Sequence, residues 1–162
     1  MVFRVYDASA FYAGVPFASP EQGYTTPLVF DEIKHIKKDH GALDVLLQTN
    51  RLIIQDPEEQ CVCEVTEKAK KTGDFHNLSE ADRSAVALCY QLKGQIITDD
   101  FAVSNVSKNL GLDVCPVMTK GIRTVGKWNY YCHACKKNFS KITICPNCGN
   151  KLSRKLLKTK SL

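Results

Sequence analysis

Four cysteines near the C-terminus constrain the fold of this chain more than any other feature. They follow the spacing C-x2-C-x9-C-x2-C and are Cys132, Cys135, Cys145 and Cys148. Each C-x2-C pair lets two thiolates converge from one tight turn, and two such turns build a closed tetrahedral site of four sulfurs. Such a site suits one structural Zn²⁺ ion, although iron of the rubredoxin type fits the same ligands. We therefore expect a small zinc ribbon over residues 128–152.

Charge divides the chain into two parts. Residues 1–113 hold 11 Lys and Arg against all 17 acidic residues, a net charge of −6, whereas residues 114–162 hold the other 11 Lys and Arg, a net charge of +11. A basic part of this size predicts a polyanion as its partner. The residues that we expect to contact RNA are Lys127, Lys136, Lys137, Lys141, Lys151, Arg154 and Lys155.

Aromatic residues are interleaved with these lysines. Tyr130 and Tyr131 are candidates for stacking on unpaired bases. Trp128 and Phe139 are expected in the small core of the ribbon instead. His133 lies inside the first cysteine turn, but four thiolates already complete the metal shell, so we interpret it as a bystander.

Composition excludes several classes of protein. The chain is 44% hydrophobic and 24% charged, which is typical of folded rather than disordered proteins. No segment approaches the roughly 18 consecutive apolar residues of a membrane span. Arg4 and Asp7 lie where a signal peptide would need its apolar segment. Without a secretory signal, we expect a reducing, cytoplasmic compartment rather than a disulfide framework.

Short apolar strands alternate with helices in the first part of the chain. Strands are expected at residues 3–7, 51–55, 95–98 and 112–118, and helices at residues 25–38, 56–73, 79–94 and 101–111. This alternation predicts an α/β fold, with a parallel sheet covered by helices on both faces. The residues that mark helix boundaries are Thr26, Asp56 and Ser79 as N-caps and Gly73, Gly94 and Gly111 as stops.

Carboxylates gather at one edge of this predicted sheet. Asp7 ends the first strand, and Asp99 and Asp100 follow the strand at 95–98. Ligands of parallel sheets bind at the carboxyl ends of strands, where the strand order switches. Glu32 within the first helix and Asp82 at the start of the third can face the same crevice. Close carboxylates repel one another, and Mg²⁺ or Mn²⁺ would relieve that repulsion.

Each acid also has an ordinary structural interpretation. Asp82 can be the acidic member of a capping box with Ser79. Asp99 or Asp100 can cap the following helix. Glu32 can be a solvated helix residue. These alternatives stay open for each acid alone, and the joint arrangement favours the metal site.

Four short motifs resemble a known family. VYDASAF, the acid in DEI, LSEADRSAVAL and TDDFAV together resemble a PIN domain, a metal-dependent ribonuclease fold. The resemblance implies an acidic quartet of Asp7, Glu32, Asp82 and Asp100, with Asp99 as an auxiliary acid. With the ribbon included, the chain is similar to the archaeal ribosome-maturation endonucleases of the Nin-one-binding family. Asn105 departs from the pattern because a further acid can occur there, which leaves a second metal position open.

The resemblance implies an endoribonuclease that cuts precursor small-subunit rRNA at its 3′ end, in a pre-ribosomal particle with ribosome assembly proteins. One or two Mg²⁺ or Mn²⁺ ions would bind the scissile phosphate, activate water and stabilise the leaving 3′ oxygen. Ser9 and Thr98 either orient substrate or metal-bound water, or serve as a helix cap and a packed strand residue. No histidine base is required, since the four histidines form no evident cluster with the acids.

Two other functions fit parts of the pattern. One is a toxin-like PIN ribonuclease that acts on tRNA, and the other is a non-catalytic RNA-binding ribosome assembly factor. For all three functions the expected organisation is the same. It consists of a PIN-like domain over residues 1–118, a linker over 119–127, the ribbon over 128–152 and a mobile basic tail over 153–162.

Overall fold

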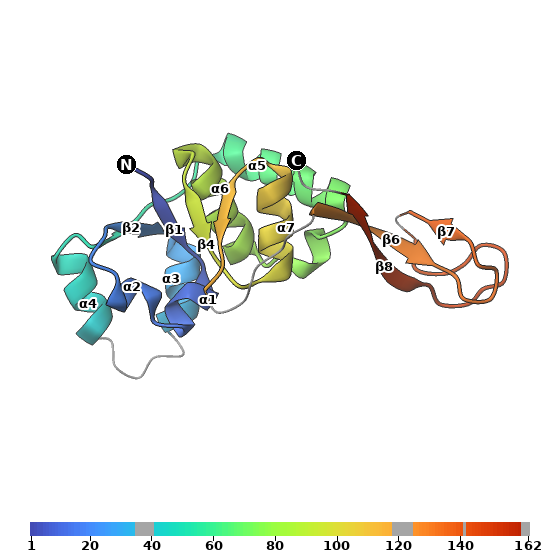
Figure 1. The fold of residues 1–162 in the computed structure, drawn as a ribbon, viewed down its shortest axis with the longest axis horizontal. Coiled ribbons are helices and arrows are strands. Elements are labelled where there is room, and N and C mark those ends of the chain that lie inside the picture. Colours follow the sequence, from blue (N-terminus) through green and yellow to red (C-terminus); the bar gives the residue numbers. More distant parts are fainter. Residues whose placement is uncertain (35–40, 118–124, 141, 160–162) are drawn as a thin grey trace.

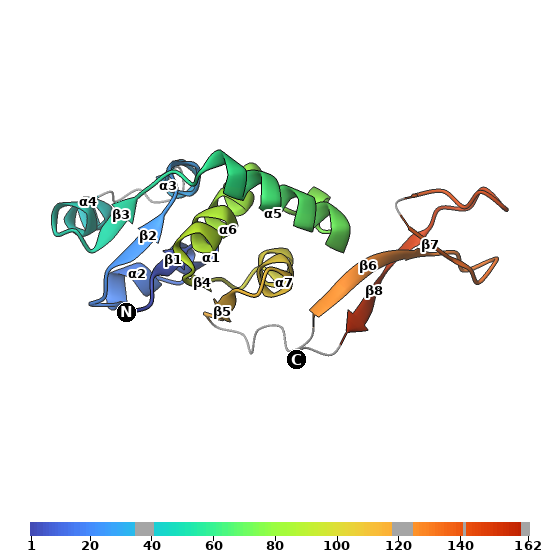
Figure 2. The same cartoon turned by 90° about the horizontal axis from the view of Figure 1, so that it is seen from above.

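The computed structural model describes residues 1–34, 41–117, 125–140 and 142–159 (Figure 1). These residues contain a five-stranded sheet and a three-stranded sheet. We call residues 1–117 the N-terminal unit and residues 125–159 the ribbon. The two long strands of the ribbon extend away from the N-terminal unit, and Figure 2 shows the same extension from above.

The five-stranded sheet is parallel throughout, as the alternation of strands and helices predicts. Its order is β3-β2-β1-β4-β5. The strands are β1 (Arg4–Tyr6), β2 (Gly23–Thr25), β3 (Leu52–Ile54), β4 (Gln95–Ile97) and β5 (Asp113–Cys115). The chain first builds outward from β1 to β3 and then returns to the other side of β1 with β4. The strand order therefore switches between β1 and β4, where ligands of such sheets bind.

Helices connect these strands. They are α1 (Ala8–Tyr12), α2 (Val15–Ala18), α3 (Pro27–Lys34), α4 (Gly41–Gln48), α5 (Glu59–Thr72), the 3-10 helix η1 (Phe75–Asn77), α6 (Glu80–Leu92) and α7 (Phe101–Asn109). The four predicted helices correspond to α3, α5, α6 and α7, although residues 35–38 of the first lie outside the described residues. Strand β2 and helices α1, α2 and α4 were not predicted. The helices α1 and α2 are too short to show a helical period.

Local capping explains some helix starts but not all. Thr26 Oγ1 accepts the Val29 N–H at 3.3 Å, and Ser79 and Asp82 form a capping box at the start of α6. The prediction of Asp56 as the cap of α5 is wrong, because Glu58 is the N-cap. A cap at Asp56 would bond the Glu58 N–H, but the Gln91 side chain of α6 accepts that N–H at 2.7 Å. A tertiary bond thus replaces the local one.

The ribbon is antiparallel, with the order β7-β6-β8. Its strands are β6 (Val125–Tyr131), β7 (Asn138–Phe139) and β8 (Ser153–Thr159). The prediction of a mobile tail over residues 153–162 is wrong for residues 153–159, since β8 pairs with β6 along its whole length, and residues 160–162 lie outside the described residues. This pairing satisfies the backbone groups of an otherwise open edge of β6. Residues 125–127, predicted as linker, also belong to β6, and residues 119–124 lie outside the described residues.

Gly94 lies just beyond the end of α6, but its role is not the predicted one of stopping the helix. The left-handed residue at the helix end is Lys93, with φ 51°. Gly94 is buried, and a Cβ atom added to it would lie 2.4 Å from the Phe3 carbonyl oxygen. The glycine is therefore needed for close backbone packing beside β1.

Substitutions at these two neighbouring positions should change stability in opposite directions. We expect Gly94→Ala to lower the free energy of unfolding by about 2 kcal/mol, because the backbone of Phe3 has to move. We expect Lys93→Gly to raise it by about 0.5–1 kcal/mol, because glycine adopts the left-handed conformation without strain. Urea denaturation of both variants measures these changes. A Gly94→Ala protein as stable as the parent would contradict this view of the packing.

Candidate active site and metal centre

Asp7 is fixed at the switch point of the sheet. Its side chain is buried, with the residue only 2% exposed. Its Oδ1 accepts hydrogen bonds from Ser9 Oγ at 2.7 Å and from the Ala10 N–H at 3.1 Å, and its Oδ2 accepts one from Thr98 Oγ1. Asp7 is also the N-cap of α1. Ser9 and Thr98 therefore position this carboxylate through direct hydrogen bonds.

Two further acids of the quartet help to cap the N-termini of helices. Asp82 Oδ2 accepts the Ser79 N–H at 2.9 Å in the capping box of α6. Asp100 Oδ1 accepts the Val103 N–H at 3.0 Å as the N-cap of α7. The capping interpretation is thus confirmed for both. A carboxylate has about four lone-pair sites, so a cap leaves others for a cation.

The four acids act on one another electrostatically through Asp82. Burial raises the pKa values of Asp7, Glu32 and Asp82. The charge of Asp82 raises the pKa values of Asp7 and Glu32 further, and the charge of Asp100 does the same for Asp82. Helix α3 packs against α6 and so brings Glu32 into this group. Within the described residues, the only acidic, histidine or cysteine side chains gathered closely enough to hold a metal ion as they stand are the four cysteines of the ribbon.

Asp99 and Asn105 have structural bonds outside this group. Asp99 Oδ1 accepts the Val117 N–H at 2.8 Å, which ties the end of β4 to the segment after β5. Asn105 is fully buried, and its Nδ2 donates to Asp74 Oδ2 at 2.6 Å. Asp74 itself is fully buried and was not singled out in the sequence. Asn105 therefore connects α7 to the turn after α5.

Two exposed aromatic residues near the acids were also missed. Tyr12 is 48% exposed at the end of α1. Its pKa is raised by partial burial and then by the charges of Glu32 and Asp7. Phe101 directly follows Asp100 and is 41% exposed. Tyr12 lies one turn beyond a helix cap, a signal that becomes visible only once α1 is known.

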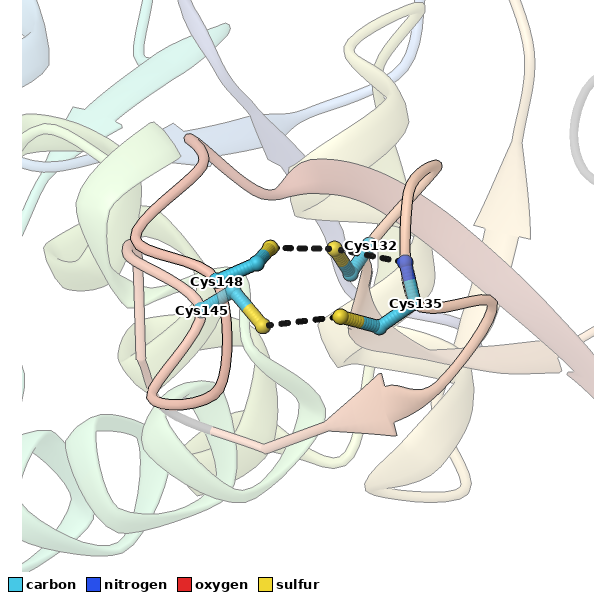
Figure 3. A group of neighbouring side chains, drawn as sticks. All are labelled: Cys132, Cys135, Cys145 and Cys148. Atoms are coloured by element: carbon cyan, nitrogen blue, oxygen red, sulfur yellow. Dashed lines mark hydrogen bonds between the residues drawn. The ribbon is translucent and has the colours of Figure 1, made fainter.

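The four cysteines of the ribbon converge as their spacing predicts (Figure 3). Their sulfur atoms all lie within 4.8 Å of one another. Cys132 and Cys148 are 3.5 Å apart and Cys135 and Cys145 are 3.9 Å apart, measured between sulfurs. Thiolates about 2.3 Å from a central ion lie about 3.8 Å apart in a tetrahedron. The spacing of the four sulfurs therefore fits a tetrahedral four-sulfur site that could hold one metal ion.

Hydrogen-bond donors favour the ionised form of one of these thiols. Burial opposes ionisation of Cys145, but the N–H groups of Cys148 and Asn147, followed by the thiols of Cys148 and Cys132, lower its pKa to about 7. The Cys135 N–H also donates to the Cys132 sulfur at 3.4 Å. His133 lies outside the group of ligands, and its Nε2 is hydrogen-bonded to Ser153 Oγ at 2.8 Å. Its interpretation as a bystander agrees with this bond.

Comparison with known proteins identifies the family. Residues 5–92 match the family described as the PIN domain of ribonuclease. The chain is 36% identical over 149 residues to endoribonuclease Nob1 of Pyrococcus abyssi, covering 90% of this chain and 89% of that protein. The chain belongs to the Nob1 endoribonuclease family. The resemblance read from the sequence is thereby confirmed.

Two other relatives extend the comparison. Endoribonuclease Nob1 of Methanocaldococcus jannaschii is 34% identical over 164 residues, covering 99% of this chain and 81% of that protein. The 20S-pre-rRNA D-site endonuclease NOB1 of Saccharomyces cerevisiae is 35% identical over 78 residues, 48% of this chain and 17% of that protein. The likeness to the Nob1 family thus includes the ribbon as well as the N-terminal unit.

The cations predicted to contact RNA differ in their surroundings. The exposed lysines on the ribbon are Lys136, Lys137, Lys151 and Lys155, and Arg154 is exposed as well. Arg154, however, turns toward the N-terminal unit, where its Nη2 donates to the Gly73 carbonyl at 3.0 Å. The side chain of Lys127, and Lys141 as a whole, lie outside what the structure describes.

The aromatic residues of the ribbon were predicted either to pack in its core or to stack on bases, and the structure agrees with part of this prediction. Phe139 packs against the cysteine cluster, which confirms its predicted place in the core, and Tyr130 packs there too. Tyr131 lies beneath Lys155, whose Nζ is 5.5 Å from the ring centre. The side chain of Trp128 lies outside the described part.

Among the described helices, none has both the length and the apolar character that a membrane crossing needs.

The raised pKa values predict how metal-free stability depends on pH. Burial raises the pKa of Asp7 in the folded chain, so its protonated form stabilises the fold at low pH. That contribution is lost as pH rises through the folded pKa. Asp7→Asn removes the titration, and its amide can donate to Thr98 Oγ1. We therefore expect the difference in melting temperature, Asp7→Asn minus parent, to become more positive from about pH 4 to about pH 7. The measurement is made without added divalent cation.

The control for this experiment is Asp31→Asn, which removes a nearby exposed carboxylate on α3. The same increase in Asp31→Asn would show an effect of net charge rather than of burial at Asp7. A constant difference in melting temperature between Asp7→Asn and the parent over this pH range would show that burial does not penalise the Asp7 carboxylate.

Proposed function

We propose that this Nob1-family endoribonuclease requires Mg²⁺ or Mn²⁺ at its acidic quartet and cleaves precursor small-subunit rRNA at its 3′ end. The observation that carries the proposal is the position of Asp7 and Asp100 just after β1 and β4, the pair at which the strand order switches, with Asp82 near enough to act on Asp7 and Glu32 electrostatically. The name of the yeast relative, a pre-rRNA D-site endonuclease, supports this choice of substrate. A pre-ribosomal particle, with its assembly proteins, is the setting in which such a substrate occurs.

The chemistry of the donor set fits a hard divalent cation. Asp7, Glu32, Asp82 and Asp100 supply carboxylate oxygens, the ligands that Mg²⁺ and Mn²⁺ prefer. A cation bound there supplies Lewis-acid activation of water and of the scissile phosphate. Ser9 and Thr98 hold the Asp7 carboxylate in place, so that ligand is oriented before substrate arrives.

Other residues of the chain position the RNA. The exposed rings of Tyr12 and Phe101 lie beside the acids and offer faces on which bases can stack. The exposed lysines of the ribbon neutralise phosphates farther along the strand. We assign Zn²⁺ to the cysteine centre, where it holds the ribbon in shape and leaves no position open for substrate.

Removal of one acid from the quartet should abolish cleavage without unfolding the chain. We expect Glu32→Gln and Asp7→Asn each to slow cleavage about a hundredfold or more, since a metal ligand is lost. The matched control is Asp31→Asn, whose carboxylate lies next to Glu32 on α3. Cleavage is measured on a transcript that spans the 3′ end of precursor small-subunit rRNA, with Mn²⁺ or Mg²⁺ added. Mapping the cut tests the proposed substrate.

Two results would contradict the proposal. Cleavage by Glu32→Gln at the rate of the parent would exclude the acids as the catalytic site. A parent protein that binds the transcript but leaves it intact with either cation would favour a non-catalytic assembly factor.

Loss of zinc should weaken RNA binding but leave the acidic site intact. Purified protein should contain one zinc per chain by elemental analysis, and Cys145→Ser should contain little. Without the metal the two cysteine turns separate and the lysines of the ribbon scatter, so we expect RNA affinity to fall about tenfold. Cleavage at saturating protein should persist. One iron per chain instead of zinc would overturn the assignment of the ion.

A further inference from the structure

A cleft lies between the N-terminal unit and the ribbon. Its volume is about 480 Å³, within the roughly 300–1,000 Å³ of small-ligand sites. Lys70, Lys71, Phe75 and His76 line it from the N-terminal unit, and Tyr130 lines it from the ribbon. None of the described lining residues is acidic, although the N-terminal unit as a whole carries excess negative charge.

Polar contacts of Arg154, one of them to the buried Asp74, join the two walls of this cleft. Arg154 of β8 donates to the Gly73 carbonyl at 3.0 Å and lies 3.8 Å from Asp74 Oδ1. Asp74 is fixed in turn by Thr72 Oγ1 at 2.7 Å and by Asn105 Nδ2 at 2.6 Å, both on its Oδ2. The cleft is therefore formed by a defined junction between the ribbon and the end of α5.

The lining combines positive charge with aromatic faces. Lys70 and Lys71 are exposed in the last turn of α5. The Lys70 Nζ is 5.4 Å from the centre of the Phe75 ring, and its exposed ion pair with Glu67 is long, at 3.8 Å. Pairs of this kind contribute little and exchange easily. Cations beside aromatic rings match the phosphate and base of a single-stranded nucleotide.

The cleft also adjoins the acidic site. A smaller hollow of about 210 Å³ is lined by Asp74, Asn77, Asp100 and Phe101. Asp74 belongs to the junction with Arg154, and Asp100 belongs to the quartet. A strand that leaves the cleft past this junction therefore approaches Asp100.

We propose that the cleft binds one nucleotide of single-stranded RNA, between the part of the strand held by the ribbon and the part that reaches the acids. Lys70 and Lys71 contact its phosphates, and Phe75 and Tyr130 contact its base. This inference rests on the proposed function, because it assumes that the acids cleave RNA. It adds two cations of the acidic N-terminal unit to the RNA-binding surface.

The test is RNA binding by the full, zinc-loaded chain without added Mg²⁺ or Mn²⁺, so that RNA stays uncut. The probe is a fluorescently labelled single-stranded RNA with the sequence of the precursor 3′ region. We expect the double variant Lys70→Ala/Lys71→Ala to bind about tenfold more weakly, and the slope of log K against log salt to become shallower by about 1.4, the value for two phosphate contacts. Lys68→Ala, on the same helix outside the cleft, should change affinity less than about twofold.

A second variant distinguishes RNA bound inside the cleft from RNA attracted to the protein by its positive charge alone. Ser140→Leu adds bulk at an exposed lining position of the ribbon without changing charge. We expect it to weaken binding and leave the salt slope unchanged. Zinc content and melting temperature confirm that each variant is folded.

The outcomes distinguish the two proposals. The cleft site is overturned if the lysine variant and Ser140→Leu both bind RNA as tightly as the parent and with the parent's salt slope. The cleft would then be assigned to a protein partner. A parent protein with no affinity for the probe would instead overturn the proposed function.

Discussion

The pairing of β1 with β4 is the interaction on which the acidic site depends. Tyr6 lies opposite Ile97 in this parallel pair, so Asp7 and Thr98 leave the sheet side by side. A buried carboxylate is costly unless donors surround it, and Thr98 and Ser9 supply those donors. A slip of one residue would turn Asp7 to the other face of the sheet. The buried strands therefore fix the chemistry of the site as well as the fold.

Features of local origin were predictable from the sequence. Buried parallel strands read as short apolar runs, and the Ser79 cap needs only its own neighbours in the chain. Features that depend on distant partners were not. The start of α5 is set by Gln91 of another helix. Strand β8 forms because β6 is beside it, so its sequence alone resembled a basic tail. Arg154 resembled a phosphate contact for the same reason, although it faces Gly73 and Asp74.

The acidic residues themselves were recognisable from the sequence. Helix capping and metal binding were treated as alternatives for each of them. The structure shows that Asp82 and Asp100 are caps and are also electrostatically coupled members of the acidic group. Asp74 was not recognisable, because an acid just after a helix-ending glycine is ordinary in a loop. Only the fold reveals that Asn105 and Thr72 enclose it. The ribbon differs, since its metal centre is encoded almost entirely by cysteine spacing.

The double role of the aspartates affects how relatives of this chain can be interpreted. An aspartate that begins a helix is kept by selection for stability even after a nuclease has lost its activity. Asp7, Asp82 and Asp100 could therefore survive in a descendant that only binds RNA. Glu32 lies in the middle of α3, where a glutamate has no capping role. Under the proposed function, the identity of this single position should therefore separate cutting relatives from inactive ones better than the three aspartates together.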